Sequence, residues 1–126
     1  MLLELQNVRQ IPGERRRRWF SSPDLDLIVW IDTDDKPAGF ELCYDKKRQE
    51  KALRWSPSGF AHMVVDDGEG RPGRHKSSPV LTGQGAFDAD RIYKHFIAEC
   101  RQLPEEIMNF IMSIFENSSL FTAPSP

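Results

Sequence analysis

The apolar residues of this 126-residue chain follow two different periods. From Leu25 to Val65 they recur mostly at every second position, which is the side-chain period of a β-strand. From Ile92 to Phe115 they recur at every third or fourth position, which is the period of an amphipathic helix. We therefore predict an α+β fold, in which an antiparallel β-meander of about four to six strands precedes two C-terminal amphipathic helices packed on one face.

The clearest predicted strand is Leu25–Ile31. Its odd-numbered residues form one apolar face, while Ile28 and Trp30 make the other face partly apolar, which is typical of a central strand. That second face then needs cover from the rest of the chain or from a second subunit. Short connections favour antiparallel hairpins with further predicted strands at Leu2–Val8, Arg15–Phe20, Gly39–Asp45, Lys51–Ser56 and Phe60–Val65.

A long connection, Asp66–Gly85, is rich in Gly, Pro and Ser and separates the strands from the helices. The first helix has an apolar stripe made of Ile92, Tyr93, Phe96, Ile97 and Cys100. The second has a stripe made of Ile107, Phe110, Ile111, Ile114 and Phe115. We expect residues 1–117 to form a single domain and residues 118–126 to form an irregular tail.

Composition adds few constraints. The chain is 39% hydrophobic and 29% charged, with a net charge of −2, so no overall charge attracts it to nucleic acid or to an anionic membrane. No stretch approaches the roughly 20 apolar residues that span a bilayer, and we expect a cytoplasmic protein. Cys43 and Cys100 are expected to be buried thiols rather than a disulfide.

The charges are segregated along the chain. Residues 9–18 contain five arginines and one glutamate, a net charge of +4, and residues 46–54 also sum to +4. Residues 24–45 between them sum to −6. In neighbouring strands such charges can pair, so one interpretation is that the arginines pair with Asp24, Asp26 or Asp32 and stabilise the sheet.

The other interpretation is a ligand-binding segment formed by Arg15, Arg16, Arg17, Arg18 and Trp19 and continued by Phe20. Guanidinium groups beside aromatic rings can hold phosphates and stack on bases. The neighbouring acidic region would repel a polyanion, so nucleic acid is disfavoured as a partner, although salt-dependent oligonucleotide binding would test it.

Catalytic and metal-binding motifs are weak. The acids Asp32, Asp34 and Asp35 lack the spacing of a calcium loop, as do Asp66, Asp67 and Glu69, so we expect no metal and no cofactor. His62 shares a strand face with Phe60 and fits a hydrogen-bonded core histidine. It could serve a Cys43 nucleophile only if the strands bring the two together, and no catalytic residue is assigned.

The sequence does not establish a function. The leading hypothesis is a small non-enzymatic interaction module that forms a homodimer through the second face of Leu25–Ile31, with another protein as a possible partner. The alternative is a small-ligand or nucleic-acid binder that uses Arg15–Phe20. An enzyme is the third hypothesis.

Overall fold

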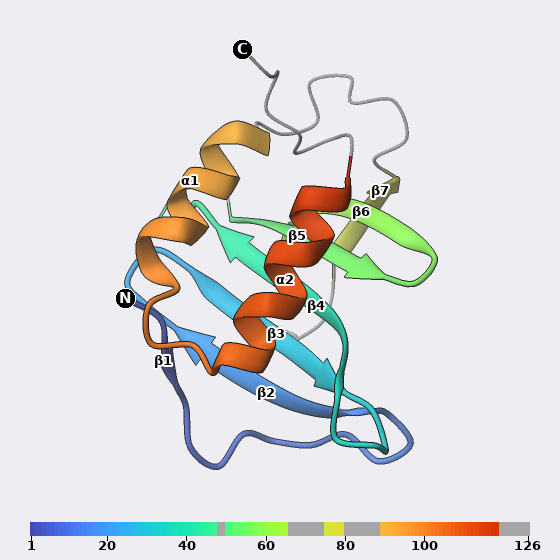
Figure 1. Cartoon of the computed structure of the whole chain (residues 1–126). Coiled ribbons are helices and arrows are strands. Elements are labelled where there is room, and N and C mark those ends of the chain that lie inside the picture. Colours follow the sequence, from blue (N-terminus) through green and yellow to red (C-terminus); the bar gives the residue numbers. More distant parts are fainter. Residues whose placement is uncertain (48–49, 66–74, 80–88, 119–126) are drawn as a thin grey trace.

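The computed structural model describes residues 1–47, 50–65, 75–79 and 89–118. The strands are β1 (Leu3–Glu4), β2 (Arg16–Ser21), β3 (Asp26–Ile31), β4 (Pro37–Tyr44), β5 (Lys51–Ser56), β6 (Gly59–Val65) and β7 (His75–Pro79), and the helices are α1 (Ala89–Glu99) and α2 (Glu105–Asn117). In this part of the chain the strands form one antiparallel sheet in sequence order, and both helices lie over one of its faces (Figure 1). The predicted α+β meander is confirmed.

Most predicted strands are shifted by one or two residues at their ends, and two places differ more. Within Leu2–Val8 only Leu3 and Glu4 pair with β2, and Leu2, not Leu3 or Leu5, enters the core. Within the expected connection Asp66–Gly85, residues 75–79 form β7 and pair with β6. Its Gly-, Pro- and Ser-rich sequence has no apolar alternation, so the two-residue period on which the prediction depended could not reveal this strand.

The core lies between the helices and the face of the sheet that they cover. Leu27, Val29, Phe40 and Leu42 from β3 and β4 pack there against the two helix stripes. The Phe115 ring on α2 packs edge to face on two other rings. Its centroid lies 5.7 Å from that of Phe96 on α1 and 5.8 Å from that of Phe40 on β4. Within the stripes, Ile97 was wrongly predicted to be buried and is 42% exposed, because it lies at the margin of α1.

The other face of the sheet, which we call the open face, carries no helix (Figure 1). Ile28 on this face is nevertheless only 7% exposed, although the sequence suggested that it needed cover from another layer. Its neighbours across the sheet are Trp19 on β2 and Glu41 on β4, so long side chains of adjacent strands surround it. The exposed apolar surface that would favour a dimer through this face is therefore smaller than the sequence suggested.

No helix of the described residues is long and apolar enough to cross a bilayer. Cys43 and Cys100 are both buried free thiols, as expected. The tail beyond residue 118 and the acids Asp66, Asp67 and Glu69 lie outside the described residues, so the predictions for them stay untested.

A candidate ligand-binding groove on the open face

The alternation of β2 divides the arginine run between the two faces of the sheet. Phe20 is buried in the core, so Arg16 and Arg18, two and four residues before it, lie on the helix-covered face. Arg17 and Trp19 lie on the open face, and Arg15 directly precedes the strand. The five predicted ligand-binding residues therefore do not form one surface, and only Arg15, Arg17 and Trp19 can act together on the open face.

Arg16 and Arg18 are both held by carboxylates. Arg16 pairs with Asp35 in the β3–β4 turn. Arg18 donates two hydrogen bonds of 2.7 Å from Nε and Nη2 to the carboxylate of Glu4. This bidentate pair lowers the pKa of Glu4 and raises that of Arg18. The structural interpretation of the arginines thus holds for these two, with different acids from those expected.

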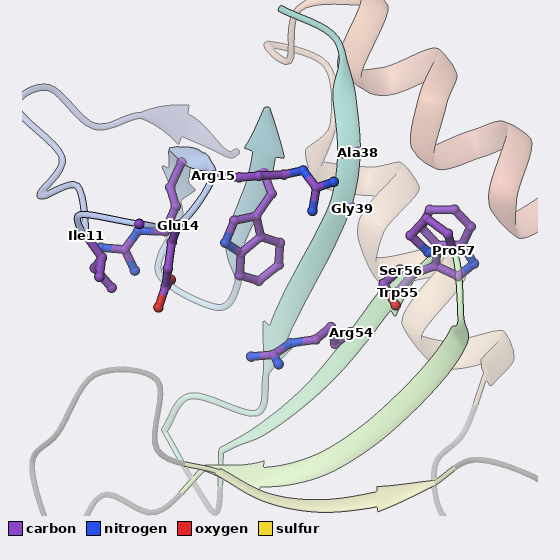
Figure 2. A pocket seen from close by; sticks show the side chains of 12 residues that line it. Ile11, Glu14, Arg15, Ala38, Gly39, Arg54, Trp55, Ser56 and Pro57 are labelled. Carbon is purple, nitrogen blue, oxygen red and sulfur yellow. The ribbon is translucent and has the colours of Figure 1, made fainter. Parts of the chain in front are cut away.

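The open face has a hollow of about 620 Å³ between the N-terminal segment and the β5–β6 turn. Figure 2 shows Arg15 on one side of it, Trp55, Ser56 and Pro57 on the other, and Arg54 and Gly39 between them. Arg17 and Trp30 also line the hollow. We call this hollow the arginine groove, because Arg15, Arg17 and Arg54 supply its cationic side chains from separate parts of the chain.

Arg54 is fixed over Trp30 by a buried carboxylate. The Arg54 guanidinium carbon lies 5.3 Å from the centroid of the Trp30 ring. The same guanidinium donates hydrogen bonds of 3.0 and 2.8 Å, from Nε and Nη2, to Oε1 of Glu41. The Glu41 side chain is 3% exposed, whereas that of Arg54 is 39% exposed. One edge of the guanidinium is thus anchored while the side chain still reaches the groove.

Gly39 shapes the groove beside Trp30. It is the direct neighbour of Trp30 across the β3–β4 pair. A Cβ at this position would lie 2.9 Å from the backbone oxygen of Trp55, closer than real Cβ contacts come, so only glycine fits without a shift of β5. The absence of a side chain at Gly39 leaves room between Trp30 and the β5–β6 turn.

Arg17 is the cation of the groove with no acidic partner. Among the described residues no carboxylate lies within ion-pair distance of it, and one guanidinium nitrogen donates to the backbone oxygen of Arg9. Its guanidinium carbon is 5.9 Å from the Trp19 ring centroid. By contrast, Arg15 lies 3.6 Å from a carboxylate oxygen of Asp32, an exposed pair of small energetic value. Arg17 therefore carries a positive charge that no described carboxylate neutralises by direct contact, although Glu14 also lines the groove.

The turn acids have a role in the β3–β4 turn itself. Asp32 and Asp34 accept hydrogen bonds from backbone N–H groups in the β3–β4 turn, and Asp35, at φ 67°, adopts the left-handed conformation that aspartate tolerates. A different group, Asp24, His95 and Glu99, places its ligand atoms within 4.8 Å of one another. Glu99 there already pairs with His95 at 3.0 Å and with the Met1 ammonium at 2.8 Å. The Met1 ammonium balances the carboxylate, so this ion pair and the His95 contact explain the group.

His62 and Cys43 lie on opposite faces of the sheet, which separates the one predicted nucleophile–base pair. His62 is buried in the core and hydrogen-bonds the Tyr44 hydroxyl, which confirms the core-histidine interpretation. Cys43, one residue before Tyr44 on β4, points to the open-face side beside Glu41. Burial strongly raises the pKa of the Cys43 thiol, and the Glu41 charge adds to this, so the thiolate nucleophile is disfavoured.

His62 should make the stability of the protein depend on pH. Burial lowers the pKa of His62, and the charge of Lys51 lowers it further. The unfolded chain then takes up a proton first as the pH falls below about 6.5, so the free energy of unfolding should fall between about pH 7 and pH 5. His62→Gln, which can still hydrogen-bond Tyr44, should show a flatter profile in urea melts across this range. If the free energy of unfolding changed equally with pH in the wild-type protein and in His62→Gln, the burial of a neutral His62 would be contradicted.

Three groove residues could not be assigned from the sequence. Arg54, Gly39 and Ser56 come from strands whose register with β3 the sequence does not specify. The residue-to-residue pairing places Gly39 beside Trp30 and Arg54 beside Glu41. Comparison with protein-family models, with curated proteins and with solved structures returns no significant match.

Proposed function

We propose that the protein is a non-enzymatic binding module that holds a small organic anion with a planar ring in the arginine groove. The observation that carries this proposal is the meeting of Arg15, Arg17 and Arg54 with the Trp30 ring around one hollow of about 620 Å³. That volume lies within the range of about 300–1,000 Å³ that is common for small-molecule sites.

Each part of the groove suits one part of such a ligand. The planar guanidinium groups donate paired hydrogen bonds, which match the two oxygens of a carboxylate or the oxygens of a phosphate. Trp30 and the stacked Arg54 offer flat surfaces on which an aromatic ring can lie. The lining includes Glu14 and Ser56 but no described histidine or cysteine, and the Ser56 hydroxyl hydrogen-bonds the Ser58 hydroxyl rather than a base, so the side chains present there favour binding over nucleophilic chemistry.

A small anion suits the groove better than a nucleic-acid strand does. A strand would need several cations in a row along its phosphates. Arg16 and Arg18 lie on the helix-covered face and pair with Asp35 and Glu4, so they cannot extend the row. The acidic β3–β4 turn lies beside Arg15 and would repel a long polyanion. The remaining cations are enough for one anionic group.

The experiment that tests the proposal compares two neighbouring arginines on opposite faces. Naphthoate, a planar ring with one carboxylate, is titrated by calorimetry into the wild-type protein, Arg17→Gln and Arg16→Gln. Each substitution removes one positive charge from β2. We expect Arg17→Gln to weaken binding about tenfold or more, the usual effect of losing a hydrogen bond to a charged group, and Arg16→Gln to leave it nearly unchanged.

Adenosine monophosphate and a mixed oligonucleotide serve as further probes in the same titrations. Equal weakening by Arg16→Gln and Arg17→Gln would show a general charge effect and would contradict the groove. Failure of naphthoate and adenosine monophosphate to bind the wild-type protein would also contradict it. Tight, salt-sensitive binding of the oligonucleotide alone would favour the nucleic-acid alternative.

The homodimer and the cytoplasmic location expected from the sequence remain predictions. With Ile28 covered, the apolar side chains most exposed among the described residues are near the N-terminus, with Leu3 at 57%. A second copy would therefore meet the β1 edge rather than the centre of the open face. Light scattering over a wide concentration range distinguishes a dimer from a monomer.

A further inference from the structure

A second hollow lies next to the arginine groove and has a different character. It has a volume of about 550 Å³ and is lined by the N-terminal segment and by β2. Its apolar residues are Leu5, Val8, Ile11, Pro12 and Trp19. Ile11 and Arg17 line both hollows, so the two are neighbours. We call the second one the apolar hollow.

The apolar hollow gathers side chains that are costly to leave in water. Of the five large hydrophobic residues most exposed in the described structure, Leu5 and Ile11 line this hollow, and Met1 and Leu3 precede it in the chain. Exposed apolar residues grouped around a concave surface are typical of a binding site rather than of ordinary surface. The lining of the arginine groove beside it is more evenly divided between polar and apolar side chains.

Arg17 lines both hollows, and Trp19 lines the apolar one. The Nε atom of Arg17 and the Nε1 atom of Trp19 are both buried, and neither has a hydrogen-bond acceptor among the described residues. Because these two nitrogens have almost no accessible surface, a molecule in either hollow cannot reach them. The half-buried Arg17 side chain nevertheless lines both hollows, so its positive charge lies beside a ligand that occupies either one.

We infer that the ligand is an amphipathic carboxylate or phosphate, whose acidic head lies on Arg17 in the arginine groove and whose apolar tail occupies the apolar hollow. This inference rests on the proposed function and specifies its ligand class. The chain would then recognise the head by charge and the tail by burial against Leu5, Val8 and Ile11.

A series of straight-chain carboxylates tests the inference on the intact chain. Butanoate, hexanoate and octanoate are titrated beside naphthoate and octanol. If the tail is buried, the affinity should rise by up to about fourfold for each added methylene. Octanol, which has the tail without the charge, should bind more weakly than octanoate. Leu5→Gln should lower the affinity for octanoate severalfold and leave the affinity for butanoate unchanged.

Leu3→Gln is the matched control, since Leu3 is more exposed than Leu5 but does not line the hollow. A loss of octanoate affinity in Leu5→Gln and not in Leu3→Gln supports the inference. If naphthoate binds and depends on Arg17 while affinity is independent of chain length, the amphipathic ligand is wrong and the proposed function stands. If no anion binds in an Arg17-dependent way, the proposed function fails and the inference fails with it.

Discussion

Phe96→Ala should lower the free energy of unfolding by about 3–5 kcal/mol, the usual cost of removing a fully buried aromatic ring. Phe96 is 0% exposed and packs edge to face on Phe115, with the ring centroids 5.7 Å apart. The cavity would open between α1, α2 and the sheet, where neighbouring aromatic rings cannot easily collapse into it. Urea unfolding followed by circular dichroism measures the change.

Lys94→Ala is the control on the same helix, because the Lys94 side chain is 74% exposed and forms a surface ion pair with Asp90. Phe110→Ala should cost less than Phe96→Ala, since Phe110 is only partly buried against Trp55. If Phe96→Ala and Lys94→Ala shifted the midpoint equally, α1 could not pack on the sheet through the face that contains Phe96.

Arg54→Ala should destabilise the protein by about 3 kcal/mol, near the lower end of the range for breaking a buried ion pair, since Arg54 itself is partly exposed. The substitution leaves the Glu41 carboxylate buried without its guanidinium, and it removes the stacking on Trp30. Glu41→Gln should cost less, because the partly exposed Arg54 can turn towards water. Urea melts of both variants measure this asymmetry.

Arg15→Ala is the matched control for Arg54→Ala. The Arg15 side chain is 57% exposed and its pair with Asp32 is long, so its loss should cost less than about 1 kcal/mol. A cost for Glu41→Gln larger than that for Arg54→Ala would contradict our description of which partner is buried.

The fold was predictable where one side of an element is apolar. Leu27 and Val29, or Ile107 and Ile111, repeat at the period of their element, and burial against a single core follows from that repeat. The prediction failed at the margins. Ile97 fits the helical stripe but lies at its edge. Strand β7 pairs with β6, but its sequence, His-Lys-Ser-Ser-Pro, has no apolar alternation that would predict a strand.

The site was only partly predictable, because it depends on register. The sequence predicted the run Arg15–Arg18 to act as one basic segment. The side chains of β2 alternate between the two faces of the sheet, so Arg16 and Arg18 lie on the helix-covered face. Arg54 is distant in sequence and reaches Trp30 only through the pairing of β3, β4 and β5. Gly39 contributes by the side chain it lacks, which no spacing pattern reveals.

The central claim is that an anion binds in the arginine groove, and mapping naphthoate onto the wild-type chain by nuclear magnetic resonance tests it most directly. We predict that the amide shifts change in a saturable way at Arg17, Trp30, Gly39 and Ser56, together with the indole N–H of Trp30, while α1 and α2 stay unchanged. Shifts confined to the helices, or small shifts spread evenly over the protein without saturation, would contradict the claim.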